Sequence, residues 1–427
     1  MTALHRTFSS LAVPNYRRYF AGQVVSISGN WMQIVAEMWL VVQLTGSGAA
    51  VGITAGLQFL PVLLFAAWGG VLADRFDKRT LLTITQLCMV LPALALWGLT
   101  AGGHIELWMV FALVLARGSV TAIDNPARQS FVTEMVGGER VVNAVALNSV
   151  IVHSARIVGP AAAAVLIALL GVAACFAVNA ATFLVMVAAL RLMDPALLQR
   201  AERVPRARGQ LRQGLAYVRR TPALRIPLVM MVVAGIVSFN FQVLLPLLAA
   251  QTWHGTAATY AALTAAMGAG SVLGALAAGA RGRVTSRTLV LAAAAFGVAE
   301  LLVALAPTLE LQALALVPMG AASVTFAAGV NSSLQRGRVM ALYSIVFLGS
   351  TPIGAPLVGW LAEVAGPRSG LFAGAAAALA AALYAHHAFA RADARAARST
   401  PQPARRGRTS EPCSAAAHHD DFASVRR

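Results

Sequence analysis

Residues 49–101 read AAVGITAGLQFLPVLLFAAWGGVLADRFDKRTLLTITQLCMVLPALALWGLTA. Two apolar runs, residues 49–72 and 80–101, are joined here by a short charged hinge, residues 73–79. Each run is long enough to cross a hydrocarbon layer of about 30 Å as a helix that rises about 1.5 Å per residue. Helices are required because lipid offers no partner for free backbone N–H and C=O groups. The stretch therefore predicts a pair of membrane-spanning helices.

The same alternation of apolar run and short hinge fills most of the chain. Hydrophobic residues make up 58% of the 427 residues and charged residues 11%, and the mean hydropathy is +0.71. A water-facing surface needs far more charge than this, so an ordinary water-soluble domain is excluded. We predict an all-α membrane protein with twelve transmembrane helices in two six-helix bundles, with spans at residues 20–44, 49–72, 80–101, 107–125, 141–170, 172–192, 226–250, 257–280, 286–306, 310–330, 338–365 and 369–390.

Basic side chains are concentrated in alternate connections between these runs. The net charge is +17, and arginines gather in hinges such as residues 75–79, 128–140 and 281–287. The connections at the other ends of these spans hold a single basic residue, Arg368. This bias follows the positive-inside rule and predicts that both termini lie in the cytoplasm. Anionic lipid headgroups account for the positive charge, so no nucleic-acid partner is expected.

The chain divides into two halves around a basic connection. We expect a six-helix bundle over residues 1–192, a cytoplasmic linker over 193–225, a second six-helix bundle over 226–390 and a disordered cytoplasmic tail over 391–427. In the linker, Leu211, Leu215 and Val218 fall on one face of a predicted amphipathic helix. The stretch Ala146-Leu147-Asn148-Ser149 recurs as Ala341-Leu342-Tyr343-Ser344. Duplicated halves of this kind are typical of secondary transporters.

Several motifs resemble those of one transporter family. The hinge sequence GGVLADRFDKR, residues 69–79, is similar to the loop 2–3 signature of the major facilitator superfamily. Residues 124–132 (DNPARQSFV), 143–149 and 338–344 (RVMALYS) resemble the bacterial transmembrane secretion effector subgroup. That subgroup includes drug–proton antiporters and siderophore exporters similar to the enterobactin exporter. The resemblance covers about residues 10–390.

The resemblance implies a secondary active transporter of the bacterial cytoplasmic membrane that works by alternating access. The expected activity is proton-coupled export of hydrophobic or amphiphilic, drug-like small molecules. The alternative within transport is the export of a siderophore or secondary metabolite, or the movement of lipid. The alternative from another class is a membrane receptor or scaffold that transports nothing. The expected partners are the substrate, protons and membrane lipids, with the chain as a monomer. No enzymatic activity, cofactor or metal is expected, and the sequence has no phosphate-binding Gly-x-x-x-x-Gly-Lys-Ser/Thr loop.

The loop 2–3 motif implies a conformational latch made by Gly70, Asp74, Arg75 and Arg79. Gly70 permits close helix approach, and Asp74 is expected at the positive N-terminal end of a neighbouring helix, the span that begins near Val339. The two arginines are expected to pair with Asp74 or with lipid phosphate. The alternative is a solvated, charge-rich turn that only sets the topology. Where the signature has Gly, this chain has Asp77, so a tight turn is less firmly expected there.

Arg156, Gly159 and Pro160 in the fifth span resemble the antiporter motif of the superfamily's exporters. Gly159 permits close contact with another helix. Pro160 removes one backbone hydrogen bond and permits a bend. The later glycines of that motif are replaced here by Ala163 and Ala164, which weakens the argument for export. A kinked packing helix without any coupling role is the alternative.

Ionisable side chains inside apolar spans are costly and mark functional sites. Glu37 and Arg117 lie at comparable depth in the first and fourth spans, which line the central cavity in this superfamily. Glu37 is predicted to carry the coupled proton, and Arg117 is predicted to pair with it or to hold an anionic substrate while Glu37 is protonated. A static buried ion pair is the alternative. Asp124 and His153 are the next proton-coupling candidates, although a core histidine is the more common role, and Glu300 in the ninth span is expected at the membrane interface.

The remaining cavity lining is expected to be apolar and aromatic, with a few amides. Such a lining suits amphiphilic or aromatic compounds better than sugars, which need many fixed polar partners. For the aromatic residues, contact with lipid is an equally good interpretation. The cavity candidates are Trp31, Gln33, Gln58, Asn148, Phe239, Asn240 and Gln242, with Trp39, Phe59 and Phe241 beside them.

Overall fold

The computed structural model describes residues 9–199, 216–219, 221–280, 285–335 and 340–399. These residues form helices and turns, with no strand among them, which confirms the predicted all-α class. The long helices are α2 (Pro14–Thr45), α3 (Gly48–Arg75), α4 (Lys78–Ala101), α5 (Leu107–Val136), α6 (Val141–Leu170), α7 (Val172–Arg191), α9 (Pro222–Val237), α11 (Ala257–Ala280), α12 (Ser286–Leu305), α13 (Leu309–Gln335), α14 (Met340–Ala365) and α15 (Pro367–Ser399).

Shorter elements complete the described chain. The short α10 (Phe241–Leu247) and the π-helix η4 (Leu248–Thr252) continue α9, so that these three elements form one interrupted span. The 3-10 turns are η1 (Ser9–Ala12), η2 (Gly138–Arg140) and η3 (Pro195–Leu197). Within the described residues, ten helical stretches are long and apolar enough to cross a membrane.

The C-terminal tail differs from the prediction in its first residues. Helix α15 continues to Ser399, so the first residues of the predicted disordered tail are helical. The rest of the tail lies outside the described residues. Of the predicted amphipathic helix in the linker, only residues 216–219 are described, and they are helical.

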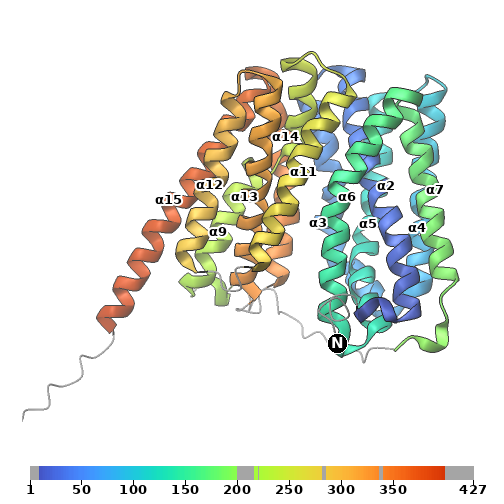
Figure 1. Cartoon of the computed structure of the whole chain (residues 1–427), viewed down its shortest axis with the longest axis horizontal. Coiled ribbons are helices and arrows are strands. Elements are labelled where there is room, and N and C mark those ends of the chain that lie inside the picture. The colour runs from blue at the N-terminus through green and yellow to red at the C-terminus, as the bar shows by residue number, and fades with distance from the viewer. Residues whose placement is uncertain (1–8, 200–215, 220, 281–284, 336–339, 400–427) are drawn as a thin grey trace, which may run out of the picture.

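Helices α2–α7 and α9–α15 lie side by side as two groups (Figure 1). In the first group α3 packs on α5, α4 on α7, and α2 on both α6 and α7. The second group repeats these pairings, because α11 packs on α13, α12 on α15, and α9 on both α14 and α15. The contacts α3–α14 and α6–α11 join the two groups.

The two ends of the helices differ in charge. We call the end where α2, α4, α6, α9 and α12 begin the basic face, because its described residues include Arg17, Arg75, Arg79, Arg140 and Arg287. The end where α3, α5, α7, α11, α13 and α15 begin is the opposite face. The tight turns there use Gly46, Gly103, Gly171 and Gly366, all with positive φ.

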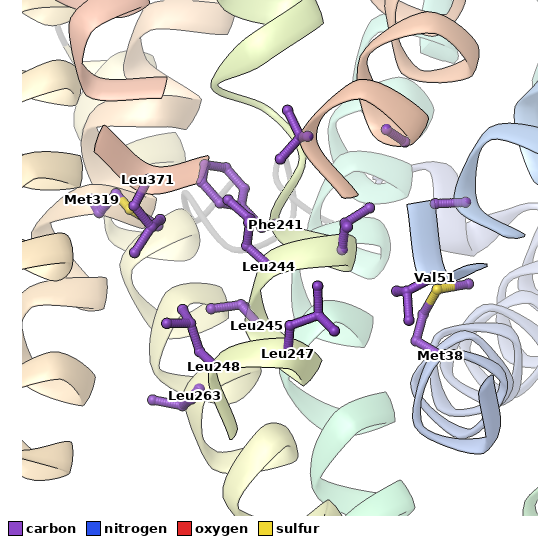
Figure 2. Close-up of a cluster of buried hydrophobic side chains, with 14 of the residues drawn as sticks. Met38, Val51, Phe241, Leu244, Leu245, Leu247, Leu248, Leu263, Met319 and Leu371 are labelled. Carbon is purple, nitrogen blue, oxygen red and sulfur yellow. The ribbon is translucent and has the colours of Figure 1, made fainter. Parts of the chain in front are cut away.

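The two helix groups are held together at the opposite face, by contacts that we call the opposite-face seal. Glu363 at the end of α14 accepts hydrogen bonds from Ser47 Oγ at 2.5 Å and Ala49 N at 2.8 Å. Gln251 Nε2 donates to Gly46 O at 2.7 Å. Beneath these polar contacts, buried leucines of α10 and η4 lie between the groups, with Leu247 on the side of Val51 (Figure 2). The protein is therefore closed at its opposite face.

Candidate functional site

A buried ion pair joins α2 to α5. Arg117 Nη2 lies 2.6 Å from Glu37 Oε2, and the side chains of Arg117 and Glu37 are 4% and 0% exposed. Two charges removed from water are stable only when their remaining hydrogen-bonding capacity is satisfied. The second oxygen of Glu37 accepts a hydrogen bond from Gln33 Nε2 at 2.7 Å. Both carboxylate oxygens therefore have a donor.

Amide side chains extend this pair across three helices. Arg117 Nη1 donates to Asn30 Oδ1 at 3.0 Å, about two helical turns along α2 from Glu37. Gln33 in turn accepts a hydrogen bond from Asn179 on α7. Arg117 Nε is buried and has no hydrogen-bond partner among the described residues. The cluster therefore fixes the ion pair in place but leaves one donor of Arg117 unused.

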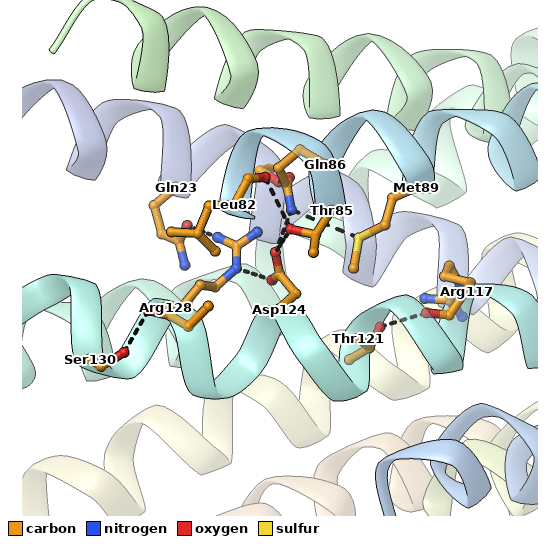
Figure 3. Close-up of polar contacts among 12 residues, drawn as sticks. Gln23, Leu82, Thr85, Gln86, Met89, Arg117, Thr121, Asp124, Arg128 and Ser130 are labelled. Carbon is orange, nitrogen blue, oxygen red and sulfur yellow. Dashed lines mark hydrogen bonds and ion pairs between the residues drawn. The ribbon is translucent and has the colours of Figure 1, made fainter. Parts of the chain in front are cut away.

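A second buried ion pair lies two turns further along α5 toward the basic face. Asp124 accepts hydrogen bonds from Thr85 Oγ1 at 2.7 Å and Gln86 Nε2 at 2.9 Å, and it pairs with Arg128 (Figure 3). Arg128 also donates to Gln23 on α2. Both oxygens of Asp124 thus have donors, and the cluster ties α2, α4 and α5 together. Among the proton-coupling candidates, the side chain of His153 lies outside the described part of the structure.

The antiporter-like motif lies where α6 crosses α2. A Cβ on Gly159 would lie 2.8 Å from Ser28 O and 3.0 Å from Met32 N, so only glycine permits this approach. The guanidinium of Arg156 stands 5.1 Å above the Trp31 ring, a cation–π contact. Pro160 is inside α6. These residues hold α6 against the helix that carries Glu37.

The latch residues fall into two groups. Gly70 is buried, and Asp74 and Arg75 are exposed at the basic face. The expected partner of Asp74, the start of the eleventh span, includes residues 336–339, which lie outside the described residues. Arg79 instead donates two hydrogen bonds of 2.7 Å to the carbonyls of Leu190 and Arg191, so it caps the end of α7.

Asp77, the residue at which the hinge departs from the family signature, has a defined role. Its carboxylate accepts a hydrogen bond of 2.8 Å from Thr80 N and so caps the N-terminus of α4. Next to it, Lys78 pairs with Glu134 near the end of α5. The substitution of glycine by aspartate therefore does not disturb the hinge.

The predicted cavity residues are not gathered in one place. Gln33 lies inside the first helix group, bonded to Glu37 and Asn179, and is 0% exposed. Gln58 on α3 is buried and its Oε1 has no described partner. Asn148 on α6 and Gln242 on α10 are half-buried. In this structure Gln33 therefore belongs to the ion-pair cluster and does not line a cavity.

Phe239 and Asn240 mark the break between α9 and α10. Phe239 lies at the centre of a ring cluster, with centroid distances of 5.1 Å to Phe296 and 5.9 Å to Phe347. Asn240 Nδ2 donates to Ile236 O at 2.7 Å, which satisfies a carbonyl that the interrupted helix leaves free.

Trp39 on α2 stacks on Tyr260 on α11, with a centroid distance of 6.4 Å, and this is a contact between the two helix groups.

A cavity of about 600 Å³ opens elsewhere, between α6 of the first group and α11, α12 and α13 of the second. Small and hydroxyl-bearing residues dominate its wall, and none of the predicted cavity residues is among them. The sequence does not predict this cavity, because small residues give no hydropathy signal that distinguishes a cavity wall from a helix contact. Its polar wall residues are Ser149, Ser154, Thr288, Thr325, Asn331 and Ser332.

Comparison with known proteins agrees with this architecture. A family model described as transmembrane secretion effector matches residues 5–409. The chain is 29% identical over 209 residues to the uncharacterized MFS-type transporter YfiS of Bacillus subtilis, which covers 48% of this chain and 49% of that protein. It is 25% identical over 360 residues to macrolide efflux protein A of Streptococcus pyogenes, which covers 81% of this chain and 88% of that protein.

Among solved structures, the nucleoside transporter NupG superposes with a TM-score of 0.67 at 11% identity, over 88% of this chain and 99% of that one. At this identity the likeness shows the fold alone. The alignment with YfiS spans only about half the length of that relative. The comparisons therefore give the fold and the family, and they leave the substrate to be inferred from the site.

Proposed function

Since this chain belongs to the transmembrane secretion effector family of the major facilitator superfamily, we propose that it is a proton-coupled exporter of hydrophobic or amphiphilic small molecules. It is a multi-pass membrane transporter and not an enzyme. The substrate class, the coupling ion and the direction of transport are the parts that we propose. We further propose that the basic face is cytoplasmic, because the positive-inside rule places arginine-rich connections there. With that orientation, the structure is closed toward the outside.

The Glu37–Arg117 pair is the observation that supports proton coupling most strongly. A carboxylate in an apolar bundle stays ionised only while its cation and its donors are in place. Protonation of Glu37 removes the charge that holds Arg117, and α5 is then free to move relative to α2. Conversely, the restored pair draws the two helices together. One proton bound or released at Glu37 therefore favours one of two helix arrangements, which is what coupling requires.

Arg117 supplies the link to the substrate. Its buried Nε–H is a donor without a partner among the described residues, and loss of the Glu37 contact frees Nη2 as well. A polar or anionic group of the substrate can then take the place of the carboxylate. The substrate and the Glu37 carboxylate thus compete for Arg117, so a proton bound at Glu37 favours substrate binding and the two events are coupled. We assign Arg117 to substrate binding on this ground.

Bulky amphiphiles fit the rest of the molecule better than sugars do. The 600 Å³ cavity has mostly small apolar wall residues with scattered hydroxyl groups, and the break in the seventh span presents a ring cluster. Sites of this kind favour large apolar ligands with few polar groups. The relation to macrolide efflux protein A points the same way, because a macrolide is a bulky amphiphile.

A susceptibility panel in a bacterial host that lacks its own export pumps tests this function. The full-length chain is expected to raise tolerance to bulky amphiphiles, macrolides among them, and Glu37→Gln is expected to abolish the gain. Glu310→Gln, which changes an exposed carboxylate on α13, is the matched control and should behave as wild type. Metal-free siderophores are tested in the same panel, as the alternative class of substrate. Tolerance that is unchanged for every amphiphile would contradict the proposed substrate class.

A further inference from the structure

Glu300 on α12 is a buried carboxyl group that the proposed coupling through Glu37 does not use. It was expected at the membrane interface, but the structure places it in the interior, with 0% of its surface exposed. Neither of its carboxyl oxygens has a hydrogen-bond donor among the described residues. By contrast, Glu37 and Asp124 each have donors on both oxygens. Glu300 is therefore the exception among these buried carboxyl groups.

The carboxyl group of Glu300 lies in a space made by a missing side chain. A Cβ on Gly374 of α15 would lie 2.6 Å from Glu300 Cδ, so a larger residue there would displace the Glu300 carboxyl group. Gly374 O also accepts a hydrogen bond of 2.7 Å from Ser238 Oγ. Ser238 is buried at the end of α9, where the seventh span is interrupted. Glu300 thus contacts Gly374, whose carbonyl is bonded to Ser238 at the break in that span.

No charged group among the described residues reaches Glu300. On its own helix the other ionisable residue is Arg287, at the basic face. Of the helices packed against α12, α13 has Glu310, exposed at its start, and α15 has Arg368, whose Nη2 donates to Ala306 O at 2.9 Å. Tyr384, His386, His387 and Arg391 lie further along α15, at least two turns beyond Gly374, and Arg225 lies at the start of α9.

An ionised Glu300 would thus be a lone charge without donors inside an apolar bundle, which is strongly unfavourable. We propose that Glu300 is a second proton-binding site, which takes up one proton from water at the opposite face as the transporter closes there. In the open form, the carboxylate accepts a proton from a hydronium ion and water is released. Closure then buries the neutral acid in the form described here. Reopening at the Ser238–Asn240 break hydrates the group and lets the proton leave.

The position of Glu300 supports exchange with the opposite face. It lies five residues before Leu305, where α12 ends at that face, or about 8 Å along the helix axis. The start of α12 at the basic face, Ser286, is about 21 Å away, nearly three times as far. The site therefore senses the pH on the opposite side of the membrane from the arginine-rich hinges. This inference rests on the proposed alternating access, but the proton occupancy of Glu300 does not depend on Glu37 or on the substrate.

The sign of the pH dependence follows from proton counting. The closed form binds one proton more than the open form, so acid at the opposite face favours closure and alkali favours opening. For a single proton, the ratio of the two forms changes by at most tenfold per pH unit. Glu300→Gln imitates the protonated side chain and should keep the protein closed at every pH.

Infrared difference spectroscopy of the full-length chain in lipid nanodiscs tests the occupancy. At neutral pH, the wild type should show the carbonyl-stretching band of a carboxylic acid without hydrogen-bond donors. Glu300→Gln should lack that band, and Glu310→Gln should keep it. A wild type without the band at neutral pH would overturn the proposal. Because no substrate is present, failure of the proposed export function leaves this result unaffected.

Thiol labelling tests the link to closure. Ala55 on α3 is 1% exposed beneath the opposite-face seal, and a cysteine there, in a chain otherwise free of cysteine, reports opening. The rate of its reaction with a membrane-impermeant reagent is divided by that of the exposed His104→Cys at the same pH, because thiolate formation alone speeds labelling as the pH rises. The normalised rate should increase with pH in the wild type. Glu300→Gln should reduce this increase, by up to tenfold per pH unit, whereas Glu310→Gln should leave it unchanged. A normalised pH dependence that is the same in Glu300→Gln as in the wild type would overturn the assignment.

Discussion

Glu363 and Ser47 join the two helix groups across the opposite face. The carboxylate on α14 accepts a hydrogen bond of 2.5 Å from Ser47 Oγ and another of 2.8 Å from Ala49 N at the start of α3. The negative charge therefore meets the positive N-terminal end of a helix that belongs to the other group. This contact is part of the opposite-face seal and must break when that face opens.

Replacement of Glu363 by Gln should weaken the seal. The amide still accepts a hydrogen bond, but the attraction of the charge to the N-terminus of α3 is lost. The reaction of a cysteine at position 55 with an impermeant reagent should become severalfold faster. Glu310→Gln, also exposed at the opposite face, serves as the control. An unchanged labelling rate would show that Glu363 only caps α3.

Replacement of Asp124 by Ala should destabilise the fold. It leaves Arg128 in a mostly buried position without its carboxylate, and truncating one partner of a buried pair is destabilising by about 3–5 kcal/mol. Thermal unfolding of the purified protein should show a clear fall in Tm. Thr121→Ala on the same helix is the control, because Thr121 Oγ1 bonds only to a carbonyl of its own helix, Arg117 O at 2.9 Å. Equal Tm values for the two variants would contradict a structural role for Asp124.

The latch proposed for the basic face depends on Asp74. Asp74→Asn should leave the protein in the membrane at normal abundance but slow transport, because the neutral amide loses its attraction to a helix N-terminus. Initial rates in membrane vesicles measure this effect. Asp77→Asn is the matched control, because asparagine is as good an N-cap for α4 as aspartate. If the Asp74 variant transports as fast as the control, the hinge is a turn that only sets the topology.

Orientation can be measured with single cysteines in a chain otherwise free of cysteine. His104 is exposed at the opposite face and Ser286 at the basic face. In intact cells, an impermeant thiol reagent should modify His104→Cys and should reach Ser286→Cys only after the cells are broken. The reverse pattern would put the basic face outside and would reverse the proposed direction of transport.

The helices were predictable because run length and charge bias act locally. Residues 49–72 are apolar and residues 73–79 are charged, so the span and its hinge follow from the chain itself. The meeting of Glu37 and Arg117 was also within reach, because counting residues from the span ends gives both side chains a similar depth. Depth along a helix is fixed by the rise per residue, whichever neighbours the helix has.

Rotation of each helix about its axis was not predictable in the same way. Gln33 is a polar residue that suits a cavity wall, yet it faces Asn179 and Glu37 inside the bundle. Glu300 was expected at the interface because the ninth span is usually peripheral in this superfamily, yet its carboxyl group lies in the interior against Gly374. Such contacts depend on residues that are far apart in the chain.

Substrate-driven proton movement in proteoliposomes tests the central claim, that Glu37 carries the coupled proton, most directly. The full-length chain should move protons across the membrane when a transported amphiphile is added, as followed by a pH-sensitive dye in the lumen. Glu37→Gln should still bind the amphiphile, without pH dependence, and should move no protons, whereas Glu310→Gln should match wild type. Full proton-coupled transport by Glu37→Gln would contradict the account and leave the Glu37–Arg117 pair a structural one.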